Sequence, residues 1–318
     1  MTVLVVPDLR IRNRTDRGLF SLVGNTPLIH LQRFGKTLPG AVSLYAKAEW
    51  YNPSGSVKDR PAANIIRNAL ADGSLSKGKR LLDSTSGNMG ISYACFGASL
   101  GISVTLVLPA NASPERIKML KVLGAELILT DPTEGSDGAQ REARRLAEEH
   151  PERYFYANQY DNPANWQAHY HSTGPEIISQ TDGEISHFIA GLGTTGTLTG
   201  TGRYLHEYCS TISVIGVQPD QPFHGLEGLK HLETAIPPGI FDPTIVDRII
   251  GVATEVAYQT VRQLAREEGL FVGVSSGAAA WAGLQVAKKL TQGVVVIMFP
   301  DAGYKYLSER FWVEGSRE

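Results

Sequence analysis

The chain has 318 residues, of which 42% are hydrophobic and 19% are charged, and it carries 33 glycines and a formal net charge of −2. This length predicts two domains, and the composition is that of a globular α/β protein, which excludes a disordered or fibrous chain. The basic residues are dispersed and form no patch for nucleic acid or an anionic membrane, so we expect small-molecule or protein partners.

Two features of the sequence bear on the compartment. Cys95 and Cys209 lie far apart and lack CxxC spacing, so we expect neither a disulfide framework nor a metal site. The apolar run at the N-terminus is interrupted by charges before it could form a signal peptide or a membrane span. Both features fit a cytoplasmic protein.

Apolar, β-rich runs alternate with segments of helical period along most of the chain, which predicts βαβ units and parallel sheets. Several of these runs are apolar on both faces, as buried parallel strands are. The predicted strands span residues 43–50, 79–84, 103–109, 125–130, 154–158, 187–192, 212–218 and 294–300. The predicted helices span residues 61–70, 88–100, 113–123, 138–150, 254–268 and 277–290.

The first candidate for catalysis or ligand binding is the segment of residues 52–60, NPSGSVKDR, which lies between a predicted strand and a predicted helix. Lys58 therefore lies near a helix N-terminus. The helix dipole and desolvation both disfavour a cation there, which favours the neutral amine that attacks a carbonyl group. The alternative is an exposed lysine in a Lys-Asp-Arg cluster, and for a lone lysine that alternative is the commoner.

The second segment is residues 84–90, STSGNMG, which follows a strand and opens a helix. Backbone N–H groups at a helix start, with hydroxyl groups beside them, can bind a carboxylate. A simple serine-rich cap of the helix is the alternative. The position at the carboxyl end of a parallel strand favours ligand binding.

The third segment is residues 191–197, GLGTTGT, which again joins a strand to a helix. It matches G-x-G-x-x-G, so a dinucleotide site with Asp220 as the ribose-binding acid is one interpretation. The three threonines add hydroxyl donors, which suit a terminal phosphate better than a buried pyrophosphate. A purely structural turn is the third possibility.

The fourth segment is residues 273–278, GVSSGA, a turn that opens another helix. The hydroxyl group of Ser275 could face a ring nitrogen. Capping of the helix by Ser275 or Ser276 is the simpler interpretation of this segment alone.

In this order, the four segments resemble the cysteine synthase family of fold type II pyridoxal-phosphate enzymes, most closely its B-type branch of O-acetylserine and O-phosphoserine sulfhydrylases. The resemblance covers nearly the whole chain. Beyond the four loops it includes residues 23–28, 158–165, 169–170, 173–176 and 301–308.

The resemblance implies pyridoxal 5′-phosphate as the cofactor, bound as a Schiff base to Lys58, which would also remove the α-proton of the amino acid as a general base. Asn88 would bind the phenolic oxygen of the cofactor and Ser275 its ring nitrogen. The phosphate would be held by Gly193, Thr194, Thr195, Gly196 and Thr197. The substrate carboxylate would be surrounded by Thr85, Ser86, Gly87, Met89 and Gln159.

The implied reaction is a β-replacement, in which sulfide displaces the leaving group of an activated serine and L-cysteine is released. Met89 stands where the family usually has threonine, so a flexible thioether replaces one hydroxyl contact to the substrate and would alter its shape preference. Some B-type relatives take O-phosphoserine through a basic residue after a Glu/Gln-Pro pair, whereas here Asp220 follows Gln218-Pro219. This favours O-acetylserine, although Lys230, His224 or His231 could supply positive charge.

The implied fold is α/β and resembles the β subunit of tryptophan synthase, with two domains that each contain a mostly parallel sheet flanked by helices. Residues 49–158 would form a small mobile domain that closes over the substrate, and residues 1–48 and 159–318 a large cofactor-binding domain. A homodimer is expected. Open alternatives are cystathionine β-synthase or serine dehydratase activity, and a role as binding partner of a serine acetyltransferase tail; the sulfur source, sulfide or a sulfur-carrier protein, also stays open.

Overall fold

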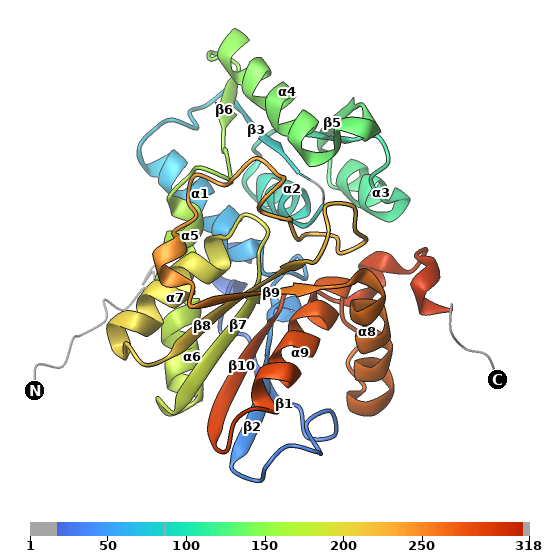
Figure 1. The fold of residues 1–318 in the computed structure, drawn as a ribbon. Coiled ribbons are helices and arrows are strands. Elements are labelled where there is room, and N and C mark those ends of the chain that lie inside the picture. The colour runs from blue at the N-terminus through green and yellow to red at the C-terminus, as the bar shows by residue number, and fades with distance from the viewer. Residues whose placement is uncertain (1–17, 86, 314–318) are drawn as a thin grey trace, which may run out of the picture.

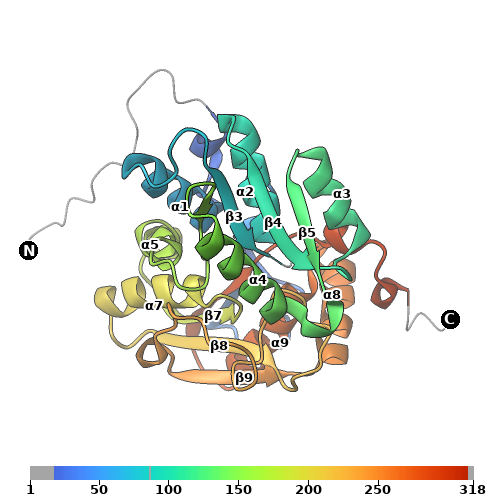
Figure 2. The same cartoon turned by 90° about the horizontal axis from the view of Figure 1, so that it is seen from above.

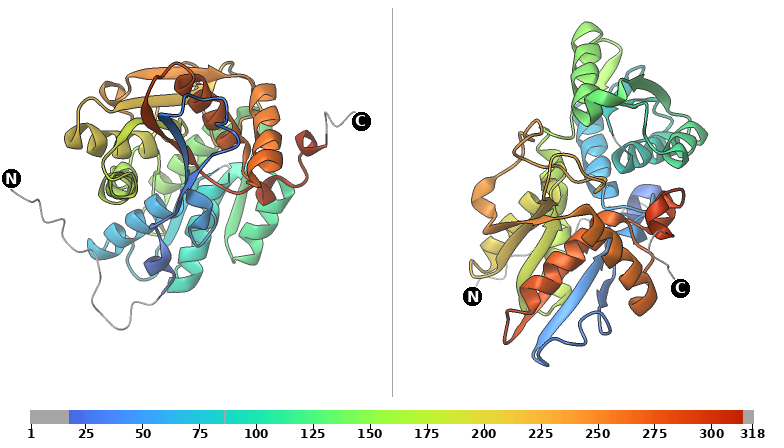
Figure 3. Two further views of the ribbon diagram at one scale, coloured as in Figure 1. Left: turned by 90° about the horizontal axis from the view of Figure 1, so that it is seen from below. Right: turned by 45° about the vertical axis from the view of Figure 1, so that its right-hand side comes forward.

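The computed structural model describes residues 18–85 and 87–313, which form two α/β units stacked on each other (Figures 1 and 3). One unit contains a six-stranded sheet in the order β1-β2-β10-β7-β8-β9, and the other a four-stranded sheet in the order β5-β4-β3-β6. We call them the large and the small domain. The predicted fold class is therefore confirmed.

In the large sheet, β1 pairs antiparallel with β2 and every other pairing is parallel. Helices α8 and α9 pack on one face of this sheet and share one apolar core. Helices α6 and α7 pack on the other face and share a second apolar core. The strands are β1 (Leu28–His30), β2 (Val42–Ala48), β7 (Ile185–Gly191), β8 (Ser213–Pro219), β9 (Arg248–Val252) and β10 (Gly293–Phe299). The helices are α5 (Ala164–His171), α6 (Thr173–Gln180), α7 (Gly196–Tyr208), α8 (Thr254–Glu268) and α9 (Val274–Ala287).

The small sheet is parallel throughout. Helices α1, α2 and α3 share the main apolar core on one face, and α4 packs over a smaller core on the other face (Figure 2). The strands are β3 (Arg80–Ser84), β4 (Val104–Pro109), β5 (Glu126–Thr130) and β6 (Tyr154–Tyr156). The helices are α1 (Asp59–Ala71), α2 (Asn88–Leu100), α3 (Pro114–Val122) and α4 (Gly135–Glu149). Short 3-10 helices lie at Leu19–Leu22, Glu49–Tyr51, Pro132–Glu134, Pro243–Ile245, Gly303–Tyr306 and Arg310–Trp312.

All eight predicted strands form, with boundaries displaced by a few residues, but the strands β1 and β9 were not predicted. Both lie at the edges of the large sheet, and most residues of β1 and β9 are at least partly exposed. Helices α5 and α6 were also not predicted. Helix α5 packs between α1 and α7 and buries the polar residues Asn165 and His169, which hides its helical period.

Among the described helices, none is long and apolar enough to cross a lipid bilayer. Within the same residues, no cluster of three or more His, Cys, Asp or Glu side chains could hold a metal ion.

Candidate active site

Lys58 occupies the position directly before α1, as the sequence predicts. Its loop is fixed to the end of β10, because Ser56 forms a β-bridge with Asp301 and the N–H of Val57 donates to the carbonyl of Pro300 at 2.8 Å. The side chain is half-buried, and within residues 18–85 and 87–313 no hydrogen bond or ion pair engages its amino group. Burial lowers the pKa of Lys58, opposed by the negative charge of Asp301 and assisted by the positive charge of Lys305.

Asn88, the first residue of α2, is held by two buried residues from the segment after β10. Its Nδ2 donates to Oδ2 of Asp301 at 2.6 Å, and its Oδ1 accepts from Nζ of Lys305 at 2.7 Å. Lys305 also donates to the carbonyl of Gly55 at 3.0 Å, and the hydroxyl of Tyr306 donates to Asp301 at 2.8 Å. Sequence analysis assigned no role to Asp301 or Lys305, although it noted the similarity of residues 301–308.

Asp301 also borders the turn that carries Ser275. A Cβ atom at Gly273 would lie 2.1 Å from Oδ1 of Asp301, so only glycine fits there. Ser275 follows in the first turn of α9 and is 5% exposed. Oδ1 of Asp301 and the hydroxyl of Ser276 are buried and have no hydrogen-bond partner within the described part of the chain.

The loop at residues 84–90 lies where β3 ends and α2 begins, but Ser86 is outside the described residues. The hydroxyl oxygen of Thr85 accepts from the N–H groups of Gly87 and Gly90, both at 3.0 Å, and so caps the start of α2. Gly87 has a φ of +156°, which only glycine adopts easily. The N–H groups of Gly87 and Gly90 are therefore engaged within the loop and are not available to a ligand.

Gln159 lies against the same loop. Its side-chain Nε2 donates to the backbone carbonyl of Ser84 at 2.6 Å, and its own backbone carbonyl accepts from Nδ2 of Asn165 at 2.7 Å. Met89 is 2% exposed and packs within the main apolar core of the small domain. Any contact of Met89 with a substrate stays a prediction.

The turn at residues 193–197 ends at the N-terminus of the 13-residue helix α7. Thr195 has a φ of 68°, and its buried hydroxyl has no hydrogen-bond partner among the residues described. Oγ1 of Thr194 accepts from Nδ2 of Asn165 at 3.1 Å, and a Cβ atom at Gly196 would collide with the same amide. A helix N-terminus with an unsatisfied buried hydroxyl fits a phosphate group.

His169 supports the last residue of that turn. Its Nε2 lies 3.2 Å from Oγ1 of Thr197 and its Nδ1 lies 2.9 Å from Oγ1 of Thr173. Burial, and then the positive charges of Arg60 and Lys58, lower the pKa of His169 well below its usual value, so the ring is neutral. The charge of Lys58 therefore acts on His169, which contacts Thr197, and is itself influenced by Asp301 and Lys305. Sequence analysis noted His169 but gave it no role.

The segment 220–242 after β8 contains the charged residues that would discriminate between O-acetylserine and O-phosphoserine. Asp220 is exposed. Lys230 pairs with Asp137 of α4 at 2.8 Å, so its charge is already matched. Nδ1 of His224 accepts from the N–H of Leu226 at 3.1 Å, and burial lowers the pKa of His224.

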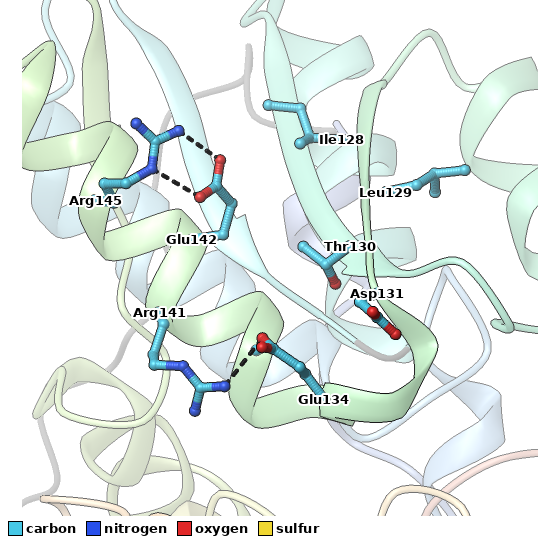
Figure 4. A pocket seen from close by; sticks show the side chains of 9 residues that line it. Ile128, Leu129, Thr130, Asp131, Glu134, Arg141, Glu142 and Arg145 are labelled. Carbon is cyan, nitrogen blue, oxygen red and sulfur yellow. Dashed lines mark hydrogen bonds and ion pairs between the residues drawn. The ribbon is translucent and has the colours of Figure 1, made fainter.

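A separate surface hollow lies between β5 and α4 (Figure 4). Its arginines pair with its own glutamates, Arg141 with Glu134 at 3.0 Å and Arg145 with Glu142 at 2.7 Å. It contains none of the predicted site residues, and its charges are balanced internally.

The chain is similar to known proteins along most of its length. The family model for pyridoxal-phosphate dependent enzymes matches residues 19–301. The chain is 53% identical over 295 residues to a cysteine synthase of Aquifex aeolicus, covering 91% of this chain and 90% of the relative. It is 43% identical over 288 residues to cysteine synthase B of Pseudomonas aeruginosa, covering 90% and 94%. The crystal structure of a cysteine synthase (OASS) from Entamoeba histolytica is similar with a TM-score of 0.89 at 35% identity, covering 95% of this chain and 92% of that one.

Proposed function

Because the chain belongs to the family of pyridoxal-phosphate dependent enzymes, we propose that it is a cysteine synthase that replaces the β-substituent of an activated serine with sulfide. The observation that carries this proposal is the half-buried amino group of Lys58, which no described residue engages and whose pKa is lowered by burial. A neutral lysine amine is what covalent attachment of an aldehyde cofactor requires.

Bound pyridoxal phosphate supplies the electron sink that makes the α-proton of an amino acid acidic and allows its β-substituent to leave. Lys58 holds the cofactor and, when the amino acid takes its place, accepts the proton from the α-carbon. Asn88 is oriented for the phenolic oxygen, because Asp301 and Lys305 fix its amide. Ser275 is assigned to the ring nitrogen.

The phosphate group is assigned to the turn of Gly193, Thr194, Thr195, Gly196 and Thr197. The unsatisfied hydroxyl of Thr195 and the N–H groups at the start of α7 supply donors to it. We assign to the neutral His169 the tautomer whose Nδ1 accepts from Thr173 and whose Nε2 donates to Thr197. In this tautomer the Thr197 hydroxyl proton is free for the phosphate.

The substrate carboxylate is assigned to the loop that contains Thr85, Ser86, Gly87 and Met89, with Gln159 beside it. Thr85 accepts from two N–H groups of this loop, and Gln159 donates to the carbonyl of Ser84. Both residues therefore stabilise the conformation of the loop. The backbone N–H groups of Asn88 and Met89, which Thr85 does not engage, would then bind the carboxylate.

O-Acetylserine is the donor that the charges favour over O-phosphoserine. Asp220 repels a phosphate dianion if it faces the donor, and Lys230 is neutralised by Asp137. For the assembly we propose a cytoplasmic homodimer in which residues 49–158 move as the small domain and exclude water from the reacting centre when they close. A serine acetyltransferase or a sulfur-carrier protein remains a candidate protein partner.

The test combines a spectrum with a product assay. The purified protein should show a visible absorption band of lysine-bound cofactor that changes when O-acetylserine is added, and it should release L-cysteine when sulfide is present. Homocysteine in place of sulfide should give much less product. A protein that cannot be loaded with pyridoxal phosphate, or one that prefers homocysteine, would contradict the proposal.

A further inference from the structure

Arg116 is a buried arginine outside the four segments. It lies in α3 of the small domain, and its side chain is 2% exposed. Its guanidinium lies over the ring of Tyr306, 4.9 Å from the ring centroid. Tyr306 in turn donates to Asp301, which orients Asn88. Arg116 is therefore packed against the group of residues that fixes Asn88.

Arg116 also lies directly against the predicted carboxylate-binding loop. A Cβ atom at Gly87 would lie 2.6 Å from Cδ of Arg116 and 2.8 Å from its Nε. The backbone of Gly87 thus rests on the arginine side chain. Because Gly87 also has a φ that other residues rarely adopt, a displacement of Arg116 would free the loop from its support.

The charge of Arg116 is matched from the other domain. Its Nη1 pairs with Oε1 of Glu227, whose side chain is 31% exposed. Glu227 lies in the segment 220–242 between β8 and β9. In Figure 1 this segment, coloured gold to orange, runs between the large sheet and the helices of the small domain.

The residues next to Glu227 pack on the predicted phosphate turn. A Cβ atom at Gly193 would lie 2.4 Å from the carbonyl oxygen of Gly228, and the N–H of Lys230 donates to the carbonyl of Leu192 at 2.8 Å. The Arg116–Glu227 ion pair therefore connects two neighbours of the site. Arg116 supports the loop that would bind the substrate, and the segment of Glu227 packs on the turn that would bind the cofactor phosphate.

A second pair joins the same segment to the small domain. Lys230, which is 7% exposed, pairs with Asp137 of α4 at 2.8 Å, and Asp137 also accepts from the N–H of Ile236 at 3.0 Å. The segment 220–242 thus contacts α3 and α4 at two separate points.

We propose that the Arg116–Glu227 pair is a latch that keeps the small domain closed on the segment 220–242, and that Arg116 is a positioning residue for the backbone of Gly87. The proposal deepens the proposed function, on which it rests for the identity of the substrate. Removal of Glu227 takes away the countercharge that this ion pair gives to the buried guanidinium of Arg116, which is unfavourable. Without Glu227, the guanidinium of Arg116 gains by reaching water, and that requires α3 to move away from the segment.

The test uses the holoenzyme with Glu227→Gln. Because Glu227 is partly exposed, this variant should fold. Glu227→Asp is the conservative variant that keeps the charge. Glu233→Gln is the matched control: it lies in the same segment and accepts from Gln218 of β8, so it does not join the two domains. Cross-domain distance is measured by pulsed electron paramagnetic resonance between spin labels on cysteines at the exposed positions Glu148 and Gln259, with Cys95 and Cys209 replaced.

We expect Glu227→Gln to lengthen and broaden the label-to-label distance and to raise KM for O-acetylserine by about tenfold with a smaller change in kcat. Glu227→Asp and Glu233→Gln should behave like the wild type. An unchanged distance distribution in Glu227→Gln would overturn the latch. A wild type without a cofactor band would instead overturn the proposed function, even if Glu227→Gln changed the label-to-label distance. The two failures are therefore distinguishable.

Discussion

The buried amino group of Lys305 donates to Oδ1 of Asn88 at 2.7 Å, across a separation of 217 residues in the chain. This bond settles which way the Asn88 amide faces, since its Nδ2 is left to donate to Asp301. It also keeps a second positive charge near Lys58. Lys305 therefore acts on both the orientation of Asn88 and the protonation of Lys58.

The variant Lys305→Met should raise the pKa of Lys58, because one of the influences that lower it is removed while burial stays. The reaction requires the neutral amine, so the acidic limb of kcat/KM against pH should move to higher pH. The measurement is a pH–rate profile with O-acetylserine, with the exposed Lys289→Met as control. An unmoved acidic limb in Lys305→Met would show that Lys305 only holds Asn88.

Replacement of Lys58 should abolish cofactor attachment. The wild type is expected to be yellow, and Lys58→Ala should lose the band of lysine-bound cofactor together with at least about a thousandfold of kcat, because the amine both binds the cofactor and moves the α-proton. An absorption spectrum and a cysteine assay check this. Lys288→Ala, at an exposed position, should keep both signals, and a Lys58→Ala protein with the wild-type band would refute the assignment.

The donor preference should follow charge. We expect kcat/KM for O-acetylserine to exceed that for O-phosphoserine on the order of tenfold or more, and Asp220→Arg to increase the latter selectively. The measurement is paired kinetics with both donors at one ionic strength. If the wild type prefers O-phosphoserine and Lys230→Ala removes that preference, then Lys230 leaves Asp137 to bind the phosphate, and the assigned role of Asp220 is wrong.

Asp83 should make the protein less stable as pH rises. The residue is fully buried at the end of β3, and burial raises its pKa to about 7, opposed by the nearby hydroxyl group of Tyr93 and by hydrogen bonds from the backbone N–H groups of Ser84 and Gln159. Between the unfolded pKa near 4 and the folded value near 7 the native state binds more protons, so the contribution of Asp83 to the free energy of unfolding falls through this window.

The predicted difference is checked by urea unfolding at pH 5 and pH 7.5. Asp83→Asn cannot titrate, so it should lose less stability than the wild type between the two pH values, by roughly 2 to 3 kcal/mol. Equal losses in both proteins would mean that Asp83 is ionised in the folded protein at pH 5.

The local parts of the site follow from the sequence alone. Each of the four segments lies at the start of a helix, and helix starts are set by turn residues and apolar periodicity within a few positions. Strand and helix order, and with it the α/β class, depend on the same short-range signals.

The partners of these loops were decided only by the tertiary structure. Asp301 and Lys305 reach Asn88 across more than 200 residues, and Glu227 reaches Arg116 from the other domain. No local pattern marks a polar residue for such a bond, because its burial depends on which elements pack against it after the two sheets have formed. For the same reason the sequence left open whether Lys230 could supply positive charge to a substrate phosphate, whereas in the structure Lys230 pairs with Asp137 of α4.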